Sequence, residues 1–353
     1  MKKIIIYVLL IIPFVFQGCT GKTEPDKPKI TPPLITEIFT ADPSAHVFNG
    51  KIYIYPSHDI DDAEAVDKNG TQYNMKDYHV FSMEDINSTP KNHGEVLNLK
   101  NVPWASRFMW APDAAYKNGT YYFYFPAHDK KGIFRIGVAT SKNPEGPFEP
   151  QPSFISGSFS IDPAVFTDTD GKSYMYFGGL WGGQLEKWQN GRFNYNLMEP
   201  MGADPALGPY IAEMSDDMLS FKSAPRMLQI LNKSGMPIAA SDKSKRFFEA
   251  AWLHKYKDTY YLSYSTGDTH MIVYATSDKA TGPFVYQGVV LQPVTGWTNH
   301  HSIVEFKGKW YLFYHDCTIS KGRDHLRNVK VTELVYNKDG SIKTIDPQPL
   351  LLK

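Results

Sequence analysis

Three carboxylic acids in short, distinctive surroundings are the residues best suited to do chemistry. Glu249 lies in "RFFEAAW", where phenylalanines and Trp252 provide low-dielectric neighbours that favour the protonated acid. Asp42 in "TADPS" and Asp162 in "SIDPA" both precede proline. A neutral acid such as Glu249 can donate a proton to a leaving oxygen, while a better solvated carboxylate such as Asp42 can accept one from water. This pairing predicts the acid and base chemistry that cleaves glycosidic bonds.

Each acid also has a purely structural interpretation. Asp42 and Asp162 could begin strands by accepting hydrogen bonds from backbone amides. Glu249 could form a buried ion pair with the nearby Arg246 or Lys245.

An internal repeat indicates how these acids are positioned. One sequence pattern recurs five times, and each copy predicts a strand, a tight turn and a second strand rich in aromatic residues. Four of the five turns contain glycine, as in Asn49-Gly50 and Asn118-Gly119. Further strands are expected after the second and fourth copies, at "ATSKNPEGPF" and "ATSDKATGPF". We therefore expect an all-β fold, a five-bladed β-propeller with four-stranded antiparallel blades around a central channel. A β-sandwich, the alternative, does not require the same phrase at the same stage of each unit.

Positions at the same stage of the five copies should meet at one mouth of the channel, because the first strand of each blade lines it. Counted back from the turns, these positions are Asp42, Ala111, Asp162, Glu249 and His300. Three acids and a histidine around a common centre are an unfavourable arrangement, because the like charges repel one another and the groups lose hydration, so a merely structural ring would more readily be apolar.

Composition excludes some partners. The chain has 37 Lys plus Arg and 37 Asp plus Glu, so its zero net charge gives no electrostatic case for nucleic acid or an anionic membrane surface. Its 22 Tyr, 21 Phe and 7 Trp suit both β-sheet packing and stacking on sugar rings.

The N-terminus predicts export. Lys2 and Lys3 precede an apolar run, residues 4–16, that is too short to span a membrane, and "FQGC" resembles a bacterial lipoprotein cleavage box ending at Cys19. Plain secretion is the alternative. We expect an export signal at 1–19, a flexible tether at 20–34 and a single propeller domain at 35–353, in the periplasm or on the cell surface. A lipid on Cys19 would be the only membrane attachment, and it would leave Cys317 without a disulfide partner.

Taken together, "TADPS", "SIDPA" and "FFEAAW" make the chain resemble glycoside hydrolase family 43 from about Ile35 to Ile345. The resemblance implies an inverting five-bladed enzyme that acts on arabinose- and xylose-containing polysaccharides. It implies that Asp42 is the general base, that Asp162 orients and tunes the acid, and that Glu249 is the general acid. It also implies that Arg327, in "HLRNV", reaches the sugar in the deepest subsite, whereas a surface arginine is the alternative.

The resemblance further implies that His300 helps to hold a calcium ion, largely coordinated by water, near the channel centre. Because "NHHS" contains two histidines, either His300 or His301 could face the metal, and a structural histidine is the alternative. We expect no organic cofactor.

Several residues are candidates for contacting the sugar. The "HD" pairs that follow second strands predict His58 and His128 at the rim of the site, with turn capping as the alternative. The pair His315 and Asp316 belongs to the same pattern. Trp110 and Trp181 could each stack on a sugar ring or belong to the core, and the ligand role is favoured only for Trp110.

The leading hypothesis is therefore an exported, monomeric glycosidase that removes α-L-arabinofuranosyl or β-D-xylosyl units from arabinan, arabinoxylan or xylan. A non-catalytic carbohydrate-binding lipoprotein is the alternative. A fructan-cleaving propeller family is weakened because "TADPSAH" lacks its "NDPNG"-type opening. The inserts at about 58–103 and 178–246 should decide between endo and exo action. The absence of an appended β-sandwich after the fifth blade favours arabinofuranosidase slightly.

Overall fold

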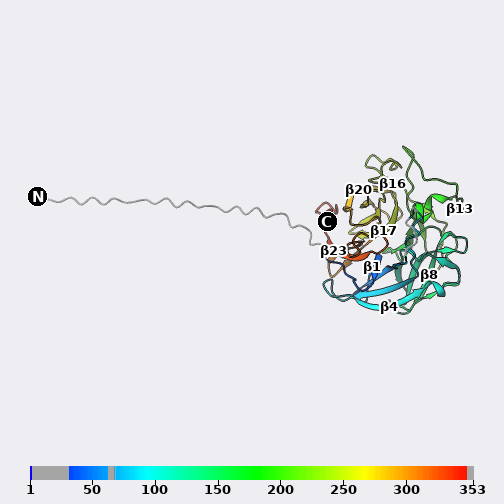
Figure 1. The fold of residues 1–353 in the computed structure, drawn as a ribbon. Helices are drawn as coiled ribbons and strands as arrows, with labels where there is room; N and C mark the ends of the chain where they lie inside the picture. The colour runs from blue at the N-terminus through cyan, green and yellow to red at the C-terminus, as the bar shows by residue number, and fades with distance from the viewer. Residues whose placement is uncertain (2–31, 63–66, 68, 348–353) are drawn as a thin grey trace.

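Five antiparallel sheets form a ring in this computed structural model (Figure 1). The structure describes residue 1, residues 32–62, residue 67 and residues 69–347. The predicted signal at 1–19, Cys19 included, and most of the predicted tether therefore lie outside the described residues, apart from residue 1. The ring runs from β1, blue in Figure 1, through β8 and β20 to β23, which returns beside β1. The prediction of a five-bladed propeller is confirmed.

The number of strands differs between the blades. Blades 1 and 3 have the expected four strands, blade 2 has an extra short strand, β5, and blade 4 gains β16 as a parallel partner of β20. Blade 5 has three strands within the described residues. Short inserts carry a hairpin and three 3₁₀ turns.

The strands of blade 1 are β1 (Phe39–Phe48), β2 (Lys51–Asp59), β3 (Asp77–Met83) and β4 (Lys91–Asn98). Those of blade 2 are β5 (Ala105–Arg107), β6 (Asp113–Lys117), β7 (Thr120–Asp129), β8 (Phe134–Ser141) and β9 (Glu149–Pro150). Those of blade 3 are β10 (Ala164–Thr167), β11 (Ser173–Phe177), β14 (Tyr210–Glu213) and β15 (Arg226–Met227). Those of blade 4 are β16 (Ile230–Leu231), β17 (Glu249–Tyr256), β18 (Thr259–Ser265), β19 (Ile272–Ser277) and β20 (Phe284–Leu291). Those of blade 5 are β21 (His301–Phe306), β22 (Lys309–Asp316) and β23 (Asn328–Leu334). The inserts contain η1 (Leu99–Asn101), η2 (Trp181–Gly183), η3 (Leu185–Lys187), β12 (Trp188–Gln189) and β13 (Arg192–Phe193).

The repeated turns form the predicted hairpins. Asn49 and Gly50 both have positive φ, 52° and 74°, as a two-residue turn that follows the strand twist requires. The innermost strands β1, β6, β10, β17 and β21 each contact the next around the ring, and β21 contacts β1. The five inner strands therefore enclose one channel.

Apolar side chains pack between neighbouring blades. The seam between blades 5 and 1 joins Ile54 and Phe81 to Phe313 and Val329. Trp252 of blade 4 packs with Leu312 of blade 5, and its indole N–H donates to the Ile303 carbonyl at 3.0 Å. The face-to-face packing of blades therefore provides the core that holds the ring closed.

A buried carboxylate links three blades in the channel. Asp113 of blade 2 accepts hydrogen bonds from Ser44 Oγ at 2.5 Å, from His46 Nε2 at 2.7 Å and from the Val165 backbone N–H at 2.6 Å. Its partners come from blades 1 and 3, so the charge is well solvated by protein donors although the side chain is fully buried.

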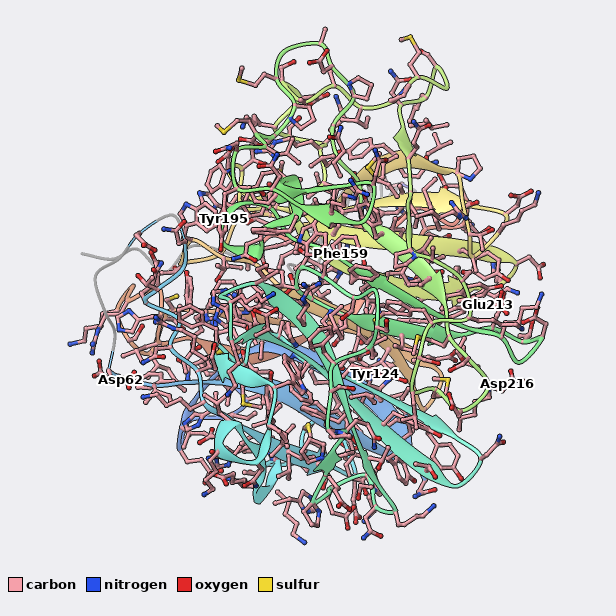
Figure 2. All side chains as sticks on the ribbon, turned by 90° about the vertical axis from the view of Figure 1, so that its right-hand side faces the viewer. Asp62, Tyr124, Phe159, Tyr195, Glu213 and Asp216 are labelled. Atoms are coloured by element: carbon pink, nitrogen blue, oxygen red, sulfur yellow. The ribbon has the colours of Figure 1, made fainter. Side chains whose placement is uncertain are left out.

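A repeated tyrosine joins each of the first three blades to the next. Tyr55, Tyr124 and Tyr176 each stand five residues after the turn glycine. Their hydroxyl groups donate to backbone carbonyls of the following blade, at Pro144, Met218 and Ala280, with distances of 2.7, 2.9 and 2.6 Å. Tyr124 lies in the interior of the molecule, whereas Tyr195 belongs to an outer insert (Figure 2). These hydrogen bonds fix the angle between adjacent sheets.

We expect Tyr124→Phe to lower the free energy of unfolding by about 1–3 kcal/mol, because the buried Met218 carbonyl loses its donor. Urea denaturation monitored by tryptophan fluorescence measures the change. Tyr116→Phe is the control, since that ring is 48% exposed. An unchanged midpoint for Tyr124→Phe would contradict the role given to the repeated hydroxyl.

Candidate active site

The five positions predicted to converge do line one cavity. Its volume is about 530 Å³, within the usual range for small-molecule sites. The lining includes Asp42, Ala111, Asp162, Glu249 and His300. The three acids lie 120 and 87 residues apart in sequence, so only closure of the ring brings them together.

Residues with positive φ and β-bulges in the strands direct the acid side chains into this cavity. Asp42 and Asp162 adopt left-handed conformations, with φ of 49° and 57°, and Ala250 beside Glu249 has φ of 61°. The pairing of β1 with β2 shifts between Ala41 and Ser44, and that of β17 with β18 shifts after Glu249. Such bulges redirect a side chain away from the regular alternation of a strand, and their strain is typical of functional sites.

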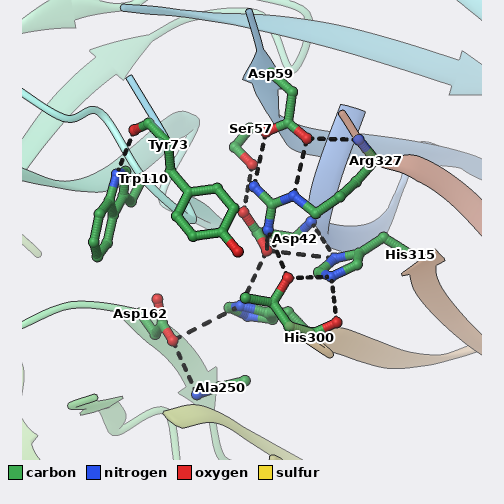
Figure 3. Close-up of polar contacts among 11 residues, drawn as sticks. Asp42, Ser57, Asp59, Tyr73, Trp110, Asp162, Ala250, His300, His315 and Arg327 are labelled. Atoms are coloured by element: carbon green, nitrogen blue, oxygen red, sulfur yellow. Dashed lines mark hydrogen bonds and ion pairs between the residues drawn. The ribbon is translucent and has the colours of Figure 1, made fainter. Parts of the chain in front are cut away.

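Asp42 is buried rather than solvated, which corrects the expectation from sequence. Burial opposes its ionisation, but Arg327, His315, His300 and a hydrogen bond from Ser57 outweigh burial and lower the pKa to about 2. Arg327 Nη1 donates to Asp42 Oδ1 at 3.0 Å, and Ser57 Oγ donates to Oδ2 at 2.5 Å (Figure 3). Neighbouring donors, rather than bulk water, keep this carboxylate ionised.

Arg327 is buried and held rigidly, which excludes the surface alternative. Its Nε and Nη2 donate to the two oxygens of Asp59 at 2.9 and 2.8 Å, and its backbone N–H donates to the same carboxylate at 2.8 Å. The guanidinium carbon lies 4.8 Å from the centre of the Tyr73 ring. A bidentate clamp of this kind fixes the direction of the guanidinium group. Arg327 also lines the cavity, and its contact with a sugar stays a prediction.

Glu249 has the environment expected of a proton donor. Burial raises its pKa to about 8, the charge of Asp42 adds to this rise, and Arg327 opposes it. The two sequence neighbours proposed as ion-pair partners bind elsewhere, Arg246 to Asp268 and Lys245 to Asp242. Phe248 lines the cavity next to Glu249, as predicted. Glu249 is therefore mostly protonated at neutral pH.

Asp162 links two of the other groups. Its Oδ2 accepts a hydrogen bond from the Ala250 backbone N–H at 3.0 Å, which positions the strand that carries Glu249. Burial and the nearby charges of Glu249 and Asp42 raise its pKa well above the usual range. Its hydrogen bond runs to another blade, so it does not serve to start its own strand.

His300 faces the channel and His301 does not. Nδ1 of His300 lies 3.7 Å from Asp42 Oδ1 and 3.8 Å from Asp162 Oδ2, whereas His301 Nε2 contacts Ser263 Oγ at 2.6 Å inside the blade. Among the described residues, His300 belongs to no group of three close metal ligands. Calcium prefers six to eight oxygens, so an ion bound at His300 would keep most of its water, and this metal site stays a prediction.

His58 and His128 lie outside the lining of the cavity. His58 Nδ1 binds Asp77 Oδ1 at 2.5 Å, and the His128 ring packs against Phe134 with centroids 4.1 Å apart. Contact of these two histidines with sugar stays a prediction, and their positions outside the cavity lining speak against it. Trp110 lines the cavity, and Trp181, for which the ligand role was not favoured, lines it as well.

Two residues that contact Asp42 could have been found by aligning the five repeats on their turn glycines instead of on the "HD" dipeptides. Ser57 and His315 each stand seven residues after a turn glycine, and both contact Asp42. The Asp42 backbone N–H donates to His315 Nδ1 at 3.0 Å, so Nε2 carries the proton and contacts the Thr298 carbonyl at 3.1 Å. His128 stands nine residues after its glycine and is not equivalent to them.

One aromatic residue of the mouth, Trp297, was also missed. Trp297 and Phe248 lie with ring centroids 5.7 Å apart, and Trp181 lies 5.8 Å from Trp297. All three line the cavity. Trp297 follows no repeated phrase, so the sequence carries little signal for it.

A five-bladed ring with a buried neutral acid and an ionised base around one cavity defines a propeller glycosidase. The sequence profile of glycosyl hydrolases family 43 matches residues 31–342. The chain belongs to this family, and it is a glycosidase rather than a non-catalytic sugar-binding protein.

Curated relatives and solved structures agree with this assignment. A xylosidase/arabinosidase 43A of Humicola insolens is 58% identical over 90% of this chain and 99% of its own, and a xylosidase/arabinosidase of Bacteroides ovatus is 53% identical over 89% and 97%. The crystal structure of the β-xylosidase/α-arabinofuranosidase CoXyl43, from a compost microbial metagenome in complex with xylotriose in a calcium-free form, has a TM-score of 0.89. It is 59% identical and covers 91% of this chain and 98% of its own.

The pKa values of Glu249 and Asp42 predict the pH dependence of kcat/KM. Activity needs Glu249 protonated, below about 8, and Asp42 ionised, above about 2. The rate should therefore stay level across neutral pH and fall tenfold per pH unit above about 8. Initial rates on an aryl xyloside, with circular dichroism at each pH as a folding control, measure the profile. An alkaline limb that begins below pH 6 would contradict the neutral state of Glu249.

Proposed function

We propose that this glycosidase removes terminal β-D-xylosyl and α-L-arabinofuranosyl units from plant polysaccharides with inversion of configuration. The observation that carries the proposal is the neutral Glu249 and the ionised Asp42 on the wall of one cavity. Relatives named for both xylosidase and arabinosidase activity support the two sugars. A related enzyme of Xanthomonas citri, 50% identical, was crystallised with xylotriose, which supports an oligosaccharide substrate.

In this mechanism Asp42 accepts a proton from water as the water attacks the anomeric carbon. Glu249 gives its proton to the departing oxygen at the same time. Asp59 holds Arg327, and Arg327 holds Asp42, so the base keeps one orientation. Asp162 holds the backbone at Ala250 and thereby the direction of the acid.

The inserts favour attack at chain ends. Trp110 Nε1 donates to the Tyr73 carbonyl at 2.8 Å, so the insert between β2 and β3 lies over the blade 2 edge of the cavity. A Cβ atom on Gly182 would lie 3.1 Å from the Asn69 carbonyl oxygen, so the first insert also meets the 3₁₀ turn after blade 3. These contacts wall off the cavity on that side, and we infer exo action from them.

Glu249→Gln tests the proposed acid. We expect a loss of about 10²- to 10⁴-fold in kcat on xylobiose, because the leaving oxygen must depart unprotonated. The loss should be much smaller on 2,4-dinitrophenyl xyloside, whose leaving group needs no proton. The control is Glu149→Gln, which changes an exposed glutamate on β9.

Proton NMR of the parent reaction on an aryl β-xyloside should show α-xylose as the first product. First appearance of β-xylose would overturn inversion. Absence of activity on every xyloside and arabinofuranoside would favour a carbohydrate-binding role instead.

We propose that the protein is exported and carries a lipid on Cys19, on the evidence of residues 1–19 alone. The described part of the chain contains no helix that is both long enough and apolar enough to cross a bilayer.

Cys19→Ala tests the lipid. We expect the full-length protein expressed in a bacterium to incorporate labelled palmitate and to sediment with membranes, and the variant to do neither. Equal labelling of both forms would contradict lipidation at Cys19.

A further inference from the structure

Three side chains of types that commonly ligate metals lie together on blade 1, outside the lining of the cavity. They are His58 on β2 and Asp77 and His79 on β3. Their ligand atoms, one from each residue, all lie within 4.8 Å of one another. Glycoside cleavage as described above uses none of them.

The sheet itself produces this cluster. Ser57 pairs with Tyr78 across the antiparallel strands β2 and β3, so His58 stands opposite Asp77. Because side chains alternate between the faces of a strand, His79 lies on the same face as Asp77, two residues further on. Two residues on one strand and a third opposite them form a three-ligand platform on one face of the sheet.

The distances lie close to those of a tetrahedral zinc site. Bonds of about 2.0–2.1 Å place neighbouring ligand atoms roughly 3.3 Å apart. His58 Nδ1 lies 2.5 Å and His79 Nε2 3.9 Å from Asp77 Oδ1. Small side-chain rotations that lengthen the first distance and shorten the second would therefore bring all three atoms onto one ion.

Access and one unpaired hydroxyl group also fit a ligand. The three side chains are 16–20% exposed, so an ion can reach them and a water can complete the fourth position. The nearby Thr40 Oγ1 is buried without a hydrogen-bond partner in the structure. Thr40 pairs with His58 in the strand ladder and therefore belongs to the same row of the sheet.

We propose that His58, Asp77 and His79 bind one zinc ion. Two imidazoles and one carboxylate form a donor set that suits zinc and contains too few oxygens for calcium. The site is separate from His300, which faces the channel. It neighbours Asp59, the clamp of Arg327, so the ion would tie β2 to β3 beside the residue that orients the base.

Zinc titration of the untagged, chelator-treated protein by isothermal calorimetry tests the proposal. We expect one equivalent to bind, with affinity reduced at least about tenfold by Asp77→Asn and by His79→Gln. His93→Gln is the matched control, because His93 is a partly buried histidine on β4 that contacts Ser82 and not the cluster. It should bind zinc like the parent.

Two further variants and one spectrum distinguish this site from the channel. His300→Gln should retain the zinc equivalent, and excess calcium should not displace it. Cobalt in place of zinc should give visible d–d bands of tetrahedral type that the Asp77→Asn protein lacks, provided that circular dichroism shows a native fold. The proposal is overturned if the parent binds no zinc, if the cluster variants bind it undiminished, or if His300→Gln alone abolishes binding.

Discussion

The buried arginine of blade 5 is the interaction on which the site depends. Arg327 is 2% exposed and is bonded to two carboxylates, Asp59 and Asp42, that both come from blade 1. A buried charge is unfavourable unless it is paired and fully hydrogen-bonded. Here Asp59 accepts from Nε and Nη2 of the guanidinium group, which leaves Nη1 to donate to Asp42 and to Thr298 Oγ1. The same cation thus closes the ring at its last seam and keeps the base ionised.

The position of Arg327 beside Asp42 also gives the two acids Asp42 and Glu249 different pKa values within one small cavity. Arg327 and the Ser57 hydroxyl donate hydrogen bonds to Asp42, and together with the nearby His315 and His300 they lower its pKa despite its burial. Glu249 has aromatic neighbours and feels the negative charge of Asp42, so its pKa rises. Two chemically similar acids therefore hold opposite protonation states at the same pH, which is the condition for concerted acid and base catalysis.

Much of this architecture could be predicted from sequence because the repeat is encoded locally. Turn residues and alternating aromatic residues predicted five hairpins, and offsets of eight or nine residues from the turns predicted which residues line the cavity. The three acids were recognised because they stand at equivalent positions of the repeat. One neighbour of Glu249, Phe248, was also predicted because it adjoins Glu249 in sequence, whereas Phe247 and Trp252 are not part of the cavity lining.

Protonation states and side-chain positions that depend on contacts between blades could not be predicted from the repeat. The ionised state of Asp42 depends on Arg327, which lies 285 residues away across the last seam. His58 and His128 share a dipeptide pattern with His315, but they stand eight and nine residues after their turn glycines rather than seven. The shift of one residue moves the His58 side chain to the other face, and the shift of two moves His128 further along its strand. Trp297 lies outside any repeat, so only the folded ring places it beside Phe248.

The repeated tyrosines bond in one direction, each reaching from its own blade to the blade made next during synthesis. Two seams remain. Trp252 bonds blade 4 to blade 5, and the seam between blades 5 and 1 is closed at the end, when the backbone carbonyls of Val329 and Arg327 accept from Leu34 and Thr40. A nascent chain therefore has stacked blades before it has a working base. Ribosomes that stall within the fifth blade would release partly folded products without hydrolytic activity.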